Sequence, residues 1–88
     1  LDFPTAFSPN GDHFNDYFEA IYSGSIKNYH IEIFNRWGEL VFETNKLEKG
    51  WDGKYENELQ PIGVFTYRVT AALNEKNLVK QGNFVLVR

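Results

Sequence analysis

A loop near the start of the chain holds the residues best suited to binding a metal ion. Asn10, Asp12, Asn15 and Asp16 all lie within residues 8–16. Carboxylates, side-chain amides and the backbone carbonyls of a glycine-containing loop are the oxygen ligands that Ca²⁺ prefers. Their spacing does not match the EF-hand loop. The same residue types also form turns in which a side chain bonds to its own backbone. Calcium binding and simple turn formation are therefore both open.

Two tryptophans lie in glycine-containing turns that could bind a ligand. One turn is Asn35-Arg36-Trp37-Gly38 and the other is Trp51-Asp52-Gly53. An exposed tryptophan beside Arg or Asp could hold a sugar ring or a partner protein, because Trp and Arg dominate binding hot spots. Alternatively, each ring folds back over one end of the domain while glycine supplies a positive φ. We expect the second arrangement, because a small core needs every large ring that it can bury.

The other reactive residues form no catalytic set. Two histidines without any cysteine make poor zinc ligands, so we expect His13 and His30 to lie at the surface. None of the serines lies in a G-x-S-x-G motif, and the sequence has no glycine-rich phosphate loop. A sandwich of 88 residues also leaves little volume for a cleft of ordinary ligand size. We therefore predict that the protein is not an enzyme.

The composition limits the class of protein that must position these residues. With 88 residues, the chain can form one domain, and its 17% aromatic content compensates for the absence of cysteine. A net charge of −3 disfavours nucleic acid as a partner. The sequence has no apolar run long enough to span a bilayer and no signal peptide at its start. It starts at Leu1 and contains no Met, so we expect a processed piece or excised domain of a longer protein.

The hydrophobic periodicity is that of β-strands. In residues 29–34, Tyr29, Ile31 and Ile33 share one face. Residues 63–71 alternate in the same way, with Phe65, Tyr67, Val69 and Ala71 on the apolar face and Thr66, Arg68 and Thr70 on the polar face. Further strands are predicted over residues 16–22, 39–43 and 83–87, with an edge strand over 4–7. Turn signals separate these runs at fairly even spacing, which indicates a single all-β domain over residues 1–88, an antiparallel sandwich or a small barrel.

Five ordered motifs make the sequence similar to the gliding-motility-associated C-terminal domain, the type B sorting domain of the type IX secretion system of Bacteroidetes. The resemblance extends over nearly the whole chain. The matching segments are residues 4–12 with 15–18, residues 33–38 with 41–43, Trp51-Asp52-Gly53, residues 61–67, and residues 82–88.

This resemblance implies both a fold and a function. The fold would be an immunoglobulin-like antiparallel β-sandwich of about seven short strands. The domain would act as a C-terminal sorting signal of a larger, often adhesive, surface protein, which passes through the periplasm to the cell surface or the medium. The implied partners are the outer-membrane type IX translocon and a dedicated outer-membrane partner protein. We expect a monomer that needs no cofactor other than a possible calcium ion.

The contact surface is expected at the turn motifs. We select Asn35, Arg36 and Trp37 as partner-binding residues, with Asp52 and Arg88 as second choices. Two alternative functions would place the domain in a different class of protein. One is an accessory module that binds carbohydrate or a surface protein through Trp37 and Trp51. The other is a purely structural spacer domain.

Overall fold

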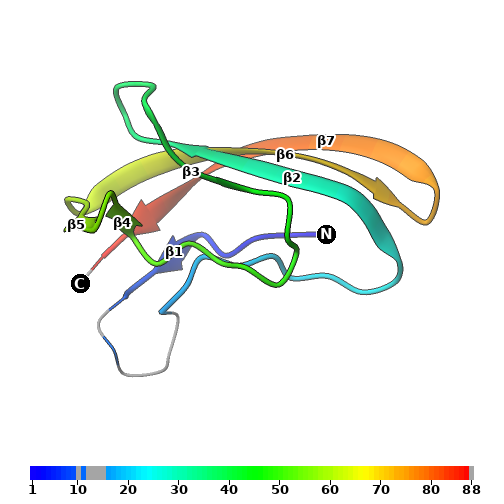
Figure 1. Ribbon diagram of the computed structural model, residues 1–88, viewed down its shortest axis with the longest axis horizontal. Coiled ribbons are helices and arrows are strands. Elements are labelled where there is room, and N and C mark those ends of the chain that lie inside the picture. Colours follow the sequence, from blue (N-terminus) through cyan, green and yellow to red (C-terminus); the bar gives the residue numbers. More distant parts are fainter. Residues whose placement is uncertain (10, 12–15, 88) are drawn as a thin grey trace.

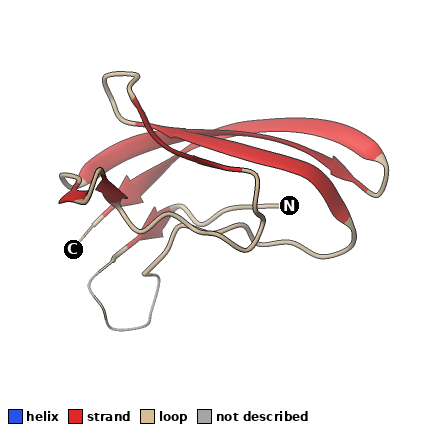
Figure 2. Cartoon of the chain, viewed as in Figure 1, coloured by secondary structure: helices blue, strands red, loops and turns tan. Residues whose placement is uncertain are grey.

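The computed structural model describes residues 1–9, 11 and 16–87, and its regular structure is entirely β-strand. Figures 1 and 2 show one large sheet with extended segments packed against one of its faces. This arrangement is a small β-sandwich and confirms the all-β prediction. The strands are β1 (Ala6–Phe7), β2 (Ile26–Phe34), β3 (Leu40–Thr44), β4 (Lys54–Tyr55), β5 (Glu58–Leu59), β6 (Gly63–Leu73) and β7 (Lys76–Leu86).

The large sheet has the strand order β1-β7-β6-β2-β3, and β4 and β5 form a separate hairpin. The longest pairing joins β6 to β7 through a tight turn at Asn74 and Glu75, whose φ angles are 50° and 71°. Two consecutive residues with left-handed backbone conformation match the twist of the strands in a β-hairpin. The expected antiparallel pairing is correct within the β2–β3, β2–β6, β4–β5 and β6–β7 pairs. It is wrong for β1, which runs parallel to β7. The long connection between these two strands allows either direction, whereas a tight hairpin requires antiparallel strands.

The second layer of the sandwich is mostly irregular. It is built from the N-terminal segment and two connecting segments, which lie below the sheet in Figure 1. Single bridges join Asp2 to Ile21 and Phe18 to Trp51. The strand predicted over residues 16–22 is therefore wrong, because its described residues pair only through these bridges. The N-terminal segment joins the sheet through β1, which hydrogen-bonds to β7, and aromatic packing holds the rest of this layer to the sheet.

The core is an aromatic cluster between the two layers. Phe18 stacks on Phe84 of β7 with ring centroids 3.8 Å apart, and Trp51 meets Phe65 of β6 edge-on at 5.1 Å. The predicted apolar faces of β2 and β6 are confirmed as buried. The fully buried side chains Trp51, Phe7, Phe84, Ile33, Leu86 and Val69 come from both layers. These large rings fill the core of a chain with no cysteine.

Because Tyr29 on β2 is buried, the free energy of unfolding depends on pH in the alkaline range. Desolvation raises the pKa of Tyr29 from 10.0 to about 12. The unfolded chain therefore loses this proton near pH 10, while the folded protein keeps it to about pH 12. The contribution of Tyr29 to the free energy of unfolding is fully present below pH 10. Between pH 10 and about pH 12 it falls by up to about 1.4 kcal/mol per pH unit.

Replacing Tyr29 by Phe is expected to remove the part of the loss in free energy of unfolding that Tyr29 causes above pH 10. Urea unfolding at several pH values between 8 and 12 measures it. Tyr22→Phe is the control, because Tyr22 is 48% exposed. An unchanged pH slope in Tyr29→Phe contradicts the prediction.

Candidate functional site

The loop between β2 and β3 is a tight turn held by Asn35. Its side-chain oxygen accepts hydrogen bonds from the backbone N–H groups of Trp37 and Glu39, at 3.0 and 2.9 Å. Its side-chain amide donates to the Glu39 carboxylate at 3.0 Å. The Gly38 N–H donates to the Asn35 carbonyl at 3.0 Å, and Gly38 has a φ of 83°. Asn35 therefore shapes the turn, and its own polar atoms are largely used within it.

This turn presents Trp37 to solvent. The loop projects from the sheet on the side opposite the second layer (Figure 1), and the Trp37 side chain is 76% exposed. The Arg36 guanidinium lies over the indole, with its carbon 4.5 Å from the ring centroid, which is a cation–π arrangement. The prediction that Trp37 folds back over the domain is wrong. The same prediction is confirmed for Trp51, which is fully buried.

A hollow lies beside the exposed indole. We call it the Trp37 hollow and define it by Asn35, Arg36, Trp37, Ile62 and Val64. Ile62 and Val64 are 66% and 52% exposed. The volume of about 260 Å³ is below the range of about 300–1,000 Å³ that is usual for small-molecule pockets. An exposed tryptophan beside an arginine and exposed aliphatic side chains is instead typical of a protein contact.

Sequence analysis missed Ile62 and Val64, although a signal was present. Val64 shares the outward face of β6 with Thr66, Arg68 and Thr70, and it is the apolar residue at one end of that polar row. Across the sheet it pairs with Val85, which is 37% exposed. This end of the outer face therefore carries exposed apolar side chains next to the β2–β3 turn.

Asp52, the second-choice contact residue that the structure describes, is not part of this hollow. The carboxylate of Asp52 accepts a hydrogen bond from the Lys54 N–H at 3.0 Å. Asp52 lines another depression of about 580 Å³, together with Tyr17, Phe42 and Lys54. Arg88 lies outside the described residues.

The predicted calcium loop lies largely outside the described residues, which include only Asp16 of its four candidate ligands. The Asp16 carboxylate accepts a hydrogen bond from the Gly11 N–H at 3.0 Å. This contact is of the kind that the turn-forming alternative expects. Asn10, Asp12 and Asn15 are not described, so calcium binding remains a prediction.

Calcium at millimolar concentration is expected to raise the melting temperature if the loop binds it. A ligand that binds only the native state stabilises it by RT ln(1 + [L]/Kd). Differential scanning calorimetry with and without Ca²⁺ measures the shift, and Asp12→Asn with Asp16→Asn should abolish it. Mg²⁺ at equal ionic strength is the control, and the absence of any shift excludes the site.

Fold and surface together define a small β-sandwich domain with a hydrogen-bonded turn that exposes a tryptophan. The chain belongs to the CHU_C type IX secretion signal domain family, whose model matches residues 1–87. No curated protein matches the sequence significantly.

Membership of this family confirms the predicted sorting function. The domain is a type IX secretion signal, and its presence implies export to the cell surface or the extracellular space. The alternative of an accessory carbohydrate-binding module is not favoured by this result. Among the described residues, the structure has no helix that is long and apolar enough to cross a membrane.

Proposed function

We propose that the secretion system recognises this domain through the Trp37 hollow. The partners would be the outer-membrane translocon and its dedicated outer-membrane partner protein, and the domain would bind as a monomer and catalyse no reaction. One observation carries this proposal: Trp37 is 76% exposed in a chain whose other tryptophan is fully buried. An indole left in water offers a large apolar area that a partner can cover.

The turn is suited to binding because it is already ordered. The three hydrogen bonds of the Asn35 side chain, at 2.9–3.0 Å, fix the backbone on which Arg36 and Trp37 sit. Little conformational entropy is then lost on association, and the lost entropy is a main cost of binding. Arg36 adds a positive charge that can pair with an acidic group of the partner. Asp52 and Arg88 remain second-choice contacts that the same assay can examine.

Trp37→Ala is expected to block export of a fused passenger. Truncating a hot-spot tryptophan costs at least about 2 kcal/mol of binding free energy, which corresponds to roughly a 30-fold loss of affinity. The experiment fuses residues 1–88 to a passenger in a strain with an intact type IX system. Passenger is then measured in the medium, at the cell surface and in the periplasm.

Two controls separate recognition from folding and leakage. Tyr22→Ala removes another exposed aromatic ring, 48% exposed, and should export normally. A strain without the translocon measures leakage. If Trp37→Ala exports as well as the unchanged domain, the proposed surface is wrong, although the sorting function stands. If the unchanged fusion stays in the periplasm, the sorting function of this chain is itself contradicted.

A further inference from the structure

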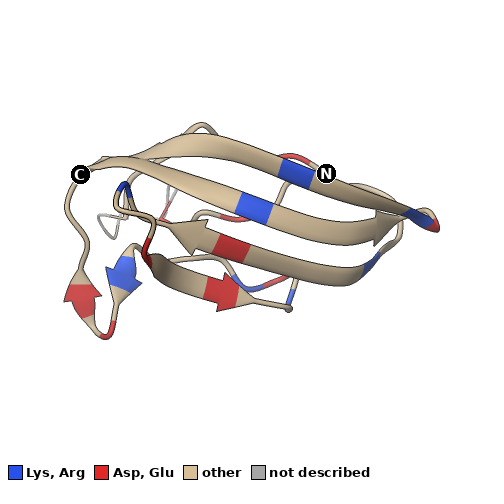
Figure 3. Ribbon diagram, turned by 90° about the horizontal axis from the view of Figure 1, so that it is seen from above, with Lys and Arg blue, Asp and Glu red and all other residues tan. Residues whose placement is uncertain are grey.

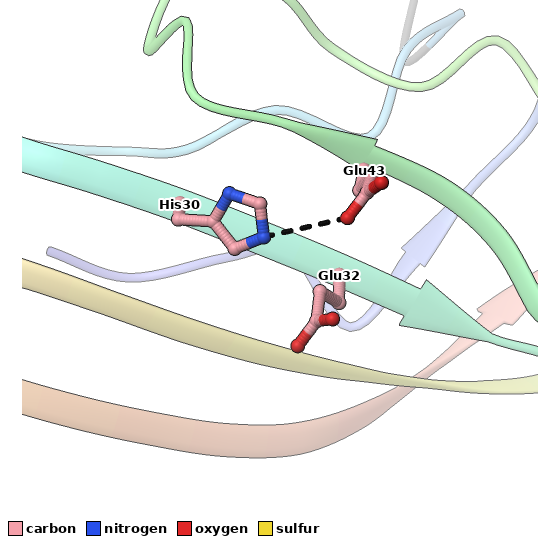
Figure 4. Close-up of side chains that lie close together, drawn as sticks. All are labelled: His30, Glu32 and Glu43. Carbon is pink, nitrogen blue, oxygen red and sulfur yellow. Dashed lines mark ion pairs between the residues drawn. The ribbon is translucent and has the colours of Figure 1, made fainter.

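A histidine and two glutamates meet on the outer face of the large sheet, away from the Trp37 hollow. His30 and Glu32 lie two residues apart on β2 and therefore point to the same face. Glu43 on the edge strand β3 is the register partner of Glu32. Figure 4 shows His30 and Glu43 turned toward each other, with Glu32 beside them. Two adjacent strands thus hold one imidazole and two carboxylates together.

The His30–Glu43 distance fits a pair of metal ligands better than a hydrogen bond. One ligand atom from each residue can be chosen so that all three lie within 4.8 Å of one another. His30 Nε2 and Glu43 Oε2 are 3.5 Å apart, which is longer than the usual 2.7–3.2 Å of a hydrogen bond. Two ligands on a tetrahedral ion with bonds of about 2.1 Å are roughly 3.4 Å apart. The His30–Glu43 pair already has this separation.

The local charge also favours a cation. Two carboxylates placed directly opposite each other across neighbouring strands repel one another. Figure 3 shows acidic positions on neighbouring strands of this sheet beside a basic one. The basic group is Arg68 on β6, whose Nη1 is 3.8 Å from Glu32 Oε1. The Arg68 side chain is 51% exposed, so it can move into solvent when a metal ion approaches.

We propose that His30, Glu32 and Glu43 form a binding site for a divalent transition-metal ion of the Zn²⁺ type. His30 Nε2 and one oxygen of each carboxylate would be the ligands, with water completing the coordination. An imidazole with two carboxylates suits Zn²⁺ and its neighbours in the first transition row, whereas Ca²⁺ and Mg²⁺ prefer all-oxygen sites. The ion would tie edge strand β3 to β2, the two strands that carry the Trp37 turn.

Zinc titration of the purified domain by calorimetry tests the site. One saturable site is expected, and Co²⁺ should bind with the visible absorption bands of a low-symmetry nitrogen and oxygen environment. Glu32→Gln, Glu43→Gln and His30→Gln should each weaken Zn²⁺ binding at least tenfold, because each removes one ligand with little change in volume. Arg68→Gln should tighten it by several-fold, because it removes a competing positive charge.

Matched variants distinguish this site from other binding. His13→Gln changes the only other histidine of the chain and should leave the zinc affinity unchanged. Circular dichroism and the metal-free melting temperature verify that every variant is folded. The proposal is overturned if no saturable zinc binding occurs. It is equally overturned if binding survives all three ligand substitutions or is lost in His13→Gln.

Discussion

Trp51→Ala is expected to lower the free energy of unfolding by about 3–5 kcal/mol. The indole is fully buried, lies 5.6 Å from Phe7 and 5.1 Å from Phe65 between ring centroids, and donates its Nε1–H to the Lys54 carbonyl at 2.9 Å. Alanine leaves a large cavity between the two layers and an unpaired carbonyl. Because small domains are stable by only about 5–15 kcal/mol, much of the folded population is lost at elevated temperature.

Urea unfolding followed by far-ultraviolet circular dichroism measures this effect without relying on tryptophan fluorescence. Trp37→Ala is the matched control, because it removes the same side chain from an exposed position. It should change the free energy of unfolding by no more than about 0.5 kcal/mol. Equal destabilisation by the two substitutions would show that the tryptophans do not divide into one core and one surface residue.

Val64→Asp is expected to reduce export of a fused passenger at least tenfold while the domain stays folded. Val64 lines the Trp37 hollow and is 52% exposed. In the free domain, water therefore still solvates a carboxylate at this position. A partner that covers the hollow would have to desolvate that charge, and about 1.4 kcal/mol of lost binding already lowers affinity tenfold.

Val79→Asp provides the matched control for this substitution. Val79 lies on β7 opposite Thr70 and is 65% exposed. Thr70 is six residues from Val64 along β6, a distance of about 20 Å. Both substitutions place Asp on an exposed sheet position, so both should cost about 1 kcal/mol of stability or less. Comparable export defects in the two variants would contradict a localised contact surface.

Strand positions could be predicted where the local pattern was strong. The alternation in residues 29–34 and 63–71 identified β2, β6 and their buried faces, because side chains of a strand point alternately to opposite sides. The predicted strand over residues 83–87 captured only the end of β7, which begins at Lys76. Its first half has exposed polar residues, so local hydrophobicity gives little sign of it.

Residues 16–22 illustrate the opposite error. The segment has the aromatic composition of a strand, but strand structure requires a neighbour with free hydrogen-bonding groups along its length. Phe18 finds such a neighbour only at Trp51, and Ile21 only at Asp2. Composition indicates that a segment will be extended and buried, whereas pairing depends on distant parts of the chain. The parallel pairing of β1 with β7 is unpredictable for the same reason.

For the functional surface, the sequence alone determined the family and the presence of two tryptophans in glycine-containing turns. These properties depend on residues close together in the chain. Tertiary structure decided that Trp51 enters the core while Trp37 stays in water, and that Ile62 and Val64 lie beside it. It also decided that Glu43 lies opposite Glu32 next to His30. Burial and cross-strand register are set by the packing of distant segments, so neighbouring residues do not encode them locally.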